Sequence, residues 1–492
     1  MRKIRFKFLW TLLVIMFVPI FSVAQEENNP VDQFGGFDLA NPLDQQSSLG
    51  ALLGYTDIGG QKYVGMRIQP EFYFGKLGFG LDVPFLFDLD SFKLRKDEYQ
   101  DGVGLLRMIR FVSWGVKKRD PLYIRFGDLS NSYIGYGILL DNYTNSVSFE
   151  KRKMGVTWDI LVKNLVGVEG LYSDFDAISR NLFAIRPYVK PLGRTSIPIV
   201  KTLDIGFTYV ADHDQTFIET DSMKVQNNTF LDKGMKAWAL DMGVIPINRQ
   251  ALQVRAYMQY GKLKKNESTV FADSLHNYLM ALPASVTDQD SANMANYDGS
   301  SGFSIGADLR LKAAGDMFRL DAKLERLWYK KYFMPQFFNL AYEMNKDARI
   351  FGLASADGKK GIYGALAITA MEKVMVGGSL MIPDEVSDNN PAVLTLDLDA
   401  SKLMEKFVIT AHYLKGGLSG LKDAFKLDER SLLNARVAYK MYKFLVVGMD
   451  YRWTWAKLDD GTFKATHYAM PYFGFQMPFN FGKNNQPIDF NN

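Results

Sequence analysis

The sequence contains no cysteine and only four histidines. Without thiols the chain forms no disulfide, so its folded state must depend on hydrogen bonds and packing alone. The histidines are scattered, at His213, His276, His412 and His467. This spacing is not typical of a metal site, and we expect neither a bound metal nor another cofactor.

Strong net charge and enzyme motifs are also missing. The net charge is only +4, which argues against nucleic-acid binding because that function usually requires a strongly basic face. The sequence has no Gly-x-Ser-x-Gly elbow and no phosphate-binding loop ending in Gly-Lys-Ser/Thr. Asp288 and Asp290 lack the further ligands of a calcium loop. We therefore expect no enzymatic activity.

Long apolar runs are absent except near the amino terminus. Four basic residues lie within positions 2–7, an apolar stretch covers residues 8–21, and Ser22, Val23 and Ala24 follow. At roughly fourteen residues the stretch is too short for a spanning helix, and the order of the three parts is typical of a secretory signal. We expect residues 1–24 to be a signal peptide, with Gln25 as the mature start. Residues 25–48 are then a periplasmic lead-in or a lumen insert.

What the sequence does contain is alternation with a period of two. In residues 317–327 four charged residues alternate with four apolar ones. The charged set is Arg319, Asp321, Lys323 and Glu325, and the apolar set is Phe318, Leu320, Ala322 and Leu324. On a helix these charges would be spread around the circumference, whereas on a strand they share one face. The segment is therefore expected to be a β-strand.

Similar alternation recurs in residues 252–261, 302–312, 392–399, 433–440 and 445–456. Counted in this way the chain has about 18 to 20 strands and no helical interludes, which excludes a βαβ fold. Aromatic residues make up 14% of the sequence, and there are 41 glycines, as expected for strands with aromatic belts. The prediction is an all-β protein.

The links between these strands alternate between short and long. Short links are predicted at residues 75–76, 117–121, 163–164, 246–250, 313–316, 372–373, 401–405 and 441–442. Long links are predicted at residues 89–102, 129–151, 212–234, 264–301, 329–360, 416–431 and 457–464. The modest loop at 176–181 and the longer turn at 191–201 are exceptions. Short periplasmic turns and long extracellular loops are typical of a transmembrane antiparallel up-and-down β-barrel, here expected over residues 49–481.

The last predicted strand resembles the carboxy-terminal assembly signal of outer-membrane barrels. The matching residues are Tyr472, Gly474, Met477 and Phe479, and the polar tail at residues 482–492 departs from that pattern. More widely, segments 69–82 and 125–128 resemble large porin-like bacterial outer-membrane β-barrel proteins of mostly unassigned function. The resemblance implies insertion in the cell outer membrane, with lipid and the barrel-assembly machinery as partners. It supplies no functional residue.

The strand parity predicts a set of charged residues that face the lumen and line the pore. They are Arg67, Glu71, Arg125, Arg255, Asp308, Arg310, Arg319, Asp321, Lys323, Glu325, Arg436, Asp450 and Arg452, with Asp82, Arg186, Lys190, Asp204, Asp397 and Lys440 on the same face. Two interpretations stay open. Either the charges line a water-filled lumen, or they pair across strands and fill the interior.

Two long loops are candidates for filling the lumen. Residues 335–344 follow a proline with apolar spacing of three and four, which predicts a short amphipathic helix. Residues 129–151 are too apolar for a solvated loop and form either an inward constriction or another strand pair.

The leading functional hypothesis is a porin-like outer-membrane channel for small solutes. The alternative is a non-conducting barrel that serves as an anchor or component of an envelope or secretion assembly, with envelope proteins as partners. A third, weaker hypothesis is a barrel-embedded hydrolase that uses His412. A lone histidine in a strand is more often a hydrogen-bonded structural residue.

Overall fold

The computed structural model describes residues 47–479, with gaps. The longer gaps are at residues 146–152, 213–234, 265–297, 344–352 and 425–430, and shorter ones interrupt other links. The expected signal peptide, the lead-in as far as residue 46 and the tail at residues 482–492 lie outside the described residues.

The described chain is built almost entirely of strands. The first ten are β1 (Ser47–Ile58), β2 (Gln61–Phe74), β3 (Leu77–Leu81), β4 (Val83–Asp88), β5 (Ile109–Trp114), β6 (Leu122–Gly127), β7 (Gly155–Val162), β8 (Val166–Tyr172), β9 (Leu182–Val189) and β10 (Asp204–Asp212). The others are β11 (Met235–Asn248), β12 (Leu252–Lys264), β13 (Ser301–Ala313), β14 (Phe318–Tyr329), β15 (Lys360–Ala370), β16 (Val374–Pro383), β17 (Ala392–Asp399), β18 (Phe407–Leu418), β19 (Ser431–Tyr442), β20 (Leu445–Lys457) and β21 (Phe463–Phe479).

Short helical elements accompany the strands in the described part of the chain. They are the helix α2 (Gly102–Arg107) and the 3-10 helix η1 (Val200–Thr202). Among the described residues, no helix is long and apolar enough to cross a bilayer.

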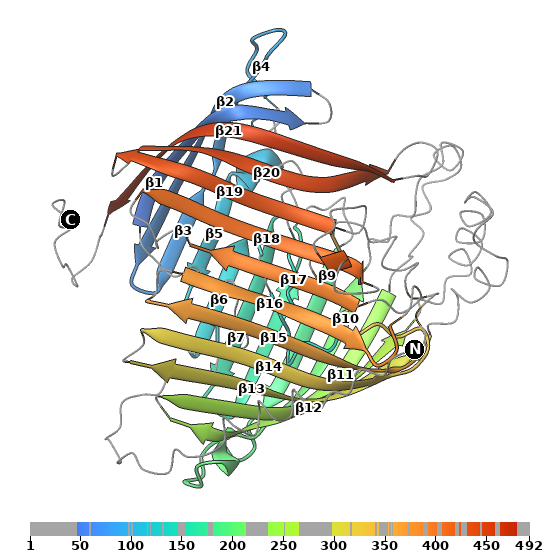
Figure 1. The fold of residues 1–492 in the computed structure, drawn as a ribbon. Coiled ribbons are helices and arrows are strands. Elements are labelled where there is room, and N and C mark those ends of the chain that lie inside the picture. Colours follow the sequence, from blue (N-terminus) through green and yellow to red (C-terminus); the bar gives the residue numbers. More distant parts are fainter. Residues whose placement is uncertain are drawn as a thin grey trace, which may run out of the picture. The chain divides into compact units, whose positions relative to one another are not determined.

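The strands form one antiparallel sheet that closes on itself. Consecutive strands pair along the chain, and the first strand β1 pairs with the last strand β21, from Ser47 opposite Phe479 to Gly54 opposite Tyr472. Figure 1 shows the red strands β20 and β21 beside the blue strands β1 and β2. Both β3 and β4 pair with β2, so they share one place in the ring, which then has 20 places. An all-antiparallel ring requires such an even number, and the value lies within the predicted range.

The links fall at alternate ends of the sheet. At one end are the turns after β2, β5, β7, β11, β13, β15, β17 and β19, together with the longer link after β9. At the other end are the long links, for example those between β10 and β11 and between β12 and β13. The link between β1 and β2 is a further exception, because it is short and lies at the end with long links. The alternation predicted from the sequence is confirmed.

The two faces of the closed sheet differ in chemistry. On the middle strands one parity carries large apolar side chains that are largely exposed, such as Met258, Ile305, Leu324 and Leu366. The opposite parity carries buried polar side chains, including Gln259 and Glu325, together with small residues. A closed barrel with an apolar outer face satisfies its backbone hydrogen bonds internally, as the hydrocarbon of a bilayer requires. The apolar parity therefore faces lipid and the polar parity faces the interior.

The structure also settles details that the sequence left open or misjudged. Residues 335–339 form a turn and an isolated bridge at Phe338 rather than the expected helix, although Tyr342 and Glu343 are helical. In the link after β6, Ser132 and Tyr143 form one isolated bridge, and the described residues do not join the sheet as a strand pair. The turn predicted at residues 441–442 begins two residues later, since β19 continues to Tyr442.

We predict that the two faces respond differently to lysine. Leu366 lies near the middle of β15 on the lipid-facing parity and is 46% exposed. The substitution Leu366→Lys should destabilise the folded barrel by about 2–4 kcal/mol, because a charge enters hydrocarbon near the midplane. Urea titration of barrels refolded in lipid vesicles measures this change. Thr410→Lys, on the inward parity of β18, is the control and should cost much less. The opposite result would invert the assignment of faces.

Candidate functional site

The interior of the barrel contains a segment that we call the inner loop, residues 129–145. It follows β6, which is only six residues long. Asn145 is buried and fixes both ends of the loop. Its Oδ1 accepts from the Leu129 amide at 2.9 Å, and its side-chain amide donates to the carbonyl oxygens of Ser173 at 2.8 Å and Lys153 at 3.3 Å. The backbone NH of Asn145 also donates to the Leu129 carbonyl at 3.0 Å.

The inner loop buries its apolar residues in a core on the inward face of β8 to β12. The loop contributes Ile134, Ile138, Leu139, Leu140 and Tyr143, and these strands contribute Leu171, Leu182, Ala184, Val210, Met235, Ala237, Ala239 and Leu263. Fully removing apolar side chains from water is worth roughly 1.5–3 kcal/mol each, which explains why so apolar a loop folds inward. The sequence left two alternatives for this segment, an inward constriction or another strand pair. The structure shows the inward loop.

The second loop, residues 330–343, packs on the inner loop and completes this core with Phe333, Phe337, Phe338 and Tyr342. Backbone hydrogen bonds join the two loops. The amides of Gln336 and Phe338 donate to the carbonyls of Ile138 at 2.8 Å and Leu139 at 3.0 Å. The apolar spacing that suggested a helix thus reflects burial against another loop.

Polar contacts with Glu343 join the two loops to each other and to Lys153. The Tyr143 hydroxyl donates to Glu343 at 2.5 Å, and Lys153 Nζ lies 2.9 Å from the same carboxylate. Burial, together with the nearby Glu343 carboxylate, raises the pKa of Tyr143, so its hydroxyl stays protonated and acts as a donor. Tyr342 donates in the same way to Asp212 of β10.

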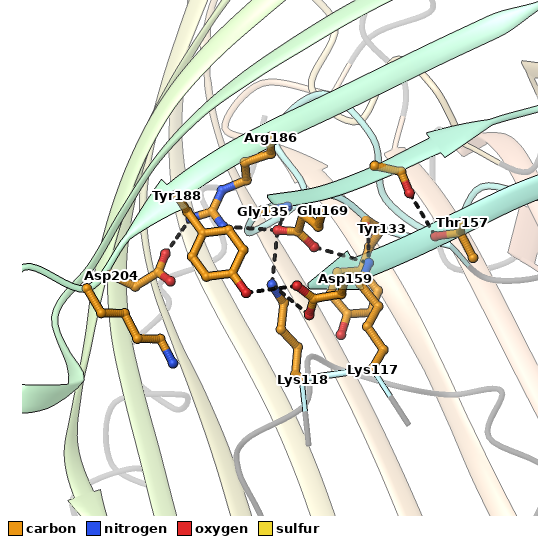
Figure 2. A network of polar contacts seen from close by, with 12 residues as sticks. Lys117, Lys118, Tyr133, Gly135, Thr157, Asp159, Glu169, Arg186, Tyr188 and Asp204 are labelled. Carbon is orange, nitrogen blue, oxygen red and sulfur yellow. Dashed lines mark hydrogen bonds and ion pairs between the residues drawn. The ribbon is translucent and has the colours of Figure 1, made fainter. Parts of the chain in front are cut away.

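A charged network lies beneath the inner loop, centred on the buried Arg186 of β9 (Figure 2). Its guanidinium contacts Asp241 of β11, with Nε to Oδ2 at 2.9 Å, and Glu169 of β8, with Nη1 to Oε1 at 3.0 Å. It also pairs with Asp204 of β10. The network connects to the inner loop because the Gly135 amide donates to Glu169 at 3.2 Å.

Two lysines from the turn between β5 and β6 complete this network. Lys118 Nζ lies 3.1 Å from Glu169 and 3.4 Å from Asp159, and Lys117 Nζ lies 3.3 Å from Glu169 (Figure 2). Burial lowers the pKa of Lys117 despite the Glu169 carboxylate. Burial also disfavours charge on Lys118, but Glu169 and Asp159 outweigh it and hold its pKa above the ordinary value. Lys117 also donates to the Tyr133 carbonyl, so this turn touches the inner loop.

A second polar network joins the inner loop to β12, β13 and β14. Arg255 pairs with Asp308, with Nε to Oδ2 at 2.8 Å, and Tyr257 donates to Glu325 at 2.7 Å. Lys323 Nζ lies 3.0 Å from Glu325 and donates to the carbonyl of Tyr136 at 2.9 Å. The rings of Tyr136 and Tyr257 stack with centroids 4.5 Å apart. Lys323 and Glu325 are thus structural contacts of the loop.

Strands β2 and β5 carry charged side chains that are partly accessible. Arg67 pairs with the buried Asp82, and Arg110 pairs with Glu71. The side chains of Arg67, Glu71 and Arg110 are 24%, 23% and 26% exposed. No residue of β1 to β4 or β16 to β21 belongs to the apolar core around the inner loop in the described part of the chain. Partly exposed charged side chains therefore lie on β2 and β5, outside the wall that the two loops cover.

Of the other residues that the sequence assigned to the lumen, Lys190 directly follows β9 and Lys440 lies in β19. Arg310 and Arg319 both contact Asp321, with Nε to carboxylate distances of 2.6 and 3.0 Å, and the Arg319 side chain is 32% exposed. Arg125 donates to the Asp128 carbonyl at 3.0 Å and lies over the Phe111 ring, while Arg436 of β19 is half-buried. The backbones of Asp450 and Arg452 lie in β20, but their side chains are outside the described set. That these residues line a solute pathway stays a prediction.

The residues proposed as an assembly signal lie in the last strand. Tyr472, Gly474, Met477 and Phe479 all belong to the segment of β21 that pairs with β1. Their side chains are outside the described set, and their role in assembly also stays a prediction.

Sequence reasoning missed several members of the networks, namely Lys117, Lys118, Asp159, Glu169 and Asp241, together with Asp141 of the inner loop, whose carboxylate lies 3.6 Å from Lys323 Nζ. For Asp241 a signal was present, because Ala237, Ala239 and Gly243 share its parity and large apolar residues occupy the other. Asp159 and Glu169 alternate with apolar residues in the same way. The two lysines gave no signal, because a charged turn usually lies in solvent.

His412 faces the interior and pairs with Asp397, with Nδ1 to Oδ1 at 2.5 Å. Its Nε2 makes no hydrogen bond with the described residues. The nearby Ser379 hydroxyl is bonded to Thr395 at 2.7 Å. No group of three or more potential metal ligands occurs in the described part of the chain. Among the described residues, no hydroxyl nucleophile of the kind that a hydrolase uses is hydrogen-bonded to His412.

The closed antiparallel sheet and the apolar outer face define the protein as a transmembrane β-barrel, and two loops fill part of its interior. No family model matches the sequence, and no curated protein matches it. Solved structures with a similar fold include Wzi of Escherichia coli, described as a carbohydrate-binding outer-membrane β-barrel, at 10% identity and a TM-score of 0.33, covering 88% of this chain and 85% of that one.

Two proteins of Pseudomonas aeruginosa are also among the matching structures. OccK11 has 9% identity and a TM-score of 0.31, covering 88% of this chain and 96% of its own. OprD has 10% identity and a TM-score of 0.31, covering 92% and 99%. At this level the matches concern architecture only.

We predict that Asn145→Ala loosens the inner loop. The substitution removes the buried side-chain hydrogen bonds at the base of the loop and leaves backbone groups unsatisfied. The expected loss is about 1–3 kcal/mol in the free energy of unfolding, with faster proteolytic cleavage within residues 129–145. Urea titration and mass analysis of the fragments measure these effects. Thr195→Ala is the control, because the Thr195 hydroxyl makes only an exposed local hydrogen bond, to the Leu192 carbonyl in the link after β9. Equal effects of the two variants would contradict the assigned role of Asn145.

Proposed function

We propose that the protein is a narrow outer-membrane channel for small polar solutes, constricted by the inner loop. The observation that carries the proposal is the asymmetry of the interior. The inner and second loops cover the wall from β8 to β12, whereas charged side chains on β2, β5 and β14 stay partly exposed to the interior. A charged, water-accessible wall beside a constricting loop is the arrangement by which porins orient small solutes.

The charges of the proposed pathway are held by ion pairs, so they present a fixed pattern to a passing solute. Arg319 is the most exposed of them and contacts Asp321, whose second partner is Arg310. Two guanidinium groups therefore share one carboxylate at this point of the wall. The exposed Arg319 guanidinium favours anions over cations in this pathway, because it presents positive charge to a passing ion.

A specific observation also favours the second hypothesis, that of a non-conducting barrel serving as an anchor in an envelope or secretion assembly. The apolar core between the two loops is fully buried and is braced by Tyr143, Lys153 and Glu343. A core of this kind seals part of the interior permanently. If it seals the whole interior, the barrel conducts no ions, and the loops outside the barrel become its contact surface.

Single-channel recording in planar bilayers decides between these two functions. We expect the full-length protein to form small, stable conductance steps. Replacing residues 132–143 by a short Gly-Ser linker should raise the conductance severalfold, because the constriction is removed while the strands remain. Silent full-length protein together with a conducting loop-deleted variant would show a plugged barrel and overturn the channel proposal. Protein copurifying from native membranes would then identify the assembly.

We predict that Arg319→Gln shifts ion preference without affecting folding. The side chain is 32% exposed and lies on the inward parity of β14, so the substitution removes a positive charge from the proposed pathway. The reversal potential in a salt gradient should move toward cation preference. Lys163→Gln, in the exposed turn between β7 and β8, is the matched control and should leave the potential unchanged. An unchanged potential for Arg319→Gln would place this residue outside the conducting path.

A further inference from the structure

A cluster of lysines lies on the lipid-facing side of the barrel, at the end with the long links. Reading the outward parity of β12 gives Leu252, Val254, Ala256, Met258, Tyr260, Lys262 and Lys264. The outward parity of β11 ends in the same way, with Leu240 followed by Trp238 and Lys236 toward that end. Both strands therefore change from apolar to basic where they leave the bilayer.

The register between β11 and β12 places the lysines together. Lys236 lies directly opposite Lys264, and Lys262 lies opposite Trp238. Side chains opposite each other on one face of an antiparallel pair have Cβ atoms about 4.5–5.5 Å apart, and like charges in that position are destabilising. The pair thus costs free energy unless negative charge lies between the two ammonium groups.

No acidic side chain supplies that charge within the described residues. None of the ion pairs in this part of the chain includes Lys236, Lys262 or Lys264, and Lys264 is exposed. Basic residues elsewhere at the same end differ in this respect. Arg326 of β14 has Asp384 as its partner at 2.6 Å, and Lys359 has Glu385 at 3.1 Å.

A row of aromatic side chains lies next to the lysines on the bilayer side. The Trp238 ring lies 5.6 Å from the ring of Tyr260, and the rings of Phe303 and Trp328 lie 5.7 Å apart on the following strands. Aromatic rows of this kind mark the level of the lipid headgroups. The unpaired lysines therefore lie at or just outside the depth where headgroup phosphates are found.

We propose that Lys236, Lys262 and Lys264 form a binding site for the phosphate groups of a membrane lipid in the leaflet next to the long loops. The phosphate would neutralise the opposing pair Lys236 and Lys264, with Lys262 as a third donor. The acyl chains would lie on the apolar surface below, over Leu240 and Met258, which are 50% and 42% exposed. Charge complementarity and the adjoining apolar surface together select a phosphorylated lipid.

The test uses the full-length barrel in detergent and native mass spectrometry to count retained lipid. The probe is phosphatidic acid, compared with diacylglycerol, which has the same acyl chains and no phosphate. We expect retention of phosphatidic acid only. The double variant Lys236→Gln/Lys264→Gln should retain less phosphatidic acid. Each of the two substitutions should weaken binding by about fivefold, the effect of one basic residue near an anionic headgroup. The variant should keep the heat-dependent gel mobility of a folded barrel.

The matched control is Lys163→Gln/Lys201→Gln, which removes two exposed lysines from the opposite end of the barrel. This variant should retain phosphatidic acid like the unmodified protein. Equal losses in the two double variants, equal retention of phosphatidic acid and diacylglycerol, or binding of inorganic phosphate as tight as that of the lipid would each overturn the proposal. The first outcome would mean that retention depends only on net charge. The second would mean that it depends only on apolar contact, and the third that the lysines bind a free anion rather than a lipid.

Discussion

The whole structure depends on one hydrogen-bonded seam, the pairing of β1 with β21. In hydrocarbon an unpaired backbone amide or carbonyl costs several kcal/mol, so a sheet that spans a bilayer cannot have free edges. The eight residue pairs from Ser47–Phe479 to Gly54–Tyr472 remove both edges at once. They also fix the parity of the ring, because a closed antiparallel sheet requires an even number of places. Every assignment of a side chain to lipid or interior follows from this closure.

Closure then imposes a second constraint, since an interior lined by charged strands must neutralise its charges. Arg186 shows how this is done: three carboxylates, from Glu169, Asp204 and Asp241, come from three different strands to surround one guanidinium. Removing one partner of a buried ion pair destabilises the folded state by much more than the intact pair stabilises it. Such a network therefore specifies the register of neighbouring strands more than it adds stability. Here the network also provides a hydrogen-bond acceptor for the inner loop, because the Gly135 amide donates to Glu169.

The sequence predicts the fold well because its main signal is local. Alternation in β12, β13 and β14 is visible from each strand alone, and link lengths define which ends lie together. The site is less predictable because its contacts are not local. Strand parity correctly places Lys323 on the inward face, but its partner Tyr136 lies 187 positions away in a loop, where the sequence gives no sign of the contact. Similarly, residues 335–339 had helical spacing, and only the inner loop explains why Phe337 and Phe338 are buried without a helix.

The inner loop depends on the side chains that the barrel wall presents to it. Its apolar residues are stable inside the barrel only because β8 to β12 present small and apolar side chains on their inward face at that height, including Ala184, Ala237 and Ala239. Larger residues there would leave no room, and charged ones would leave buried charges unpaired. Further along the same strands the inward face becomes charged, as at Arg186 and Asp241, where the loop instead offers backbone groups such as the Gly135 amide. The wall and the loop are therefore complementary along their length. A substitution on one of them would require a matching change in the other, whereas the partly exposed side chains of Arg67, Glu71 and Arg319 can vary independently of this packing.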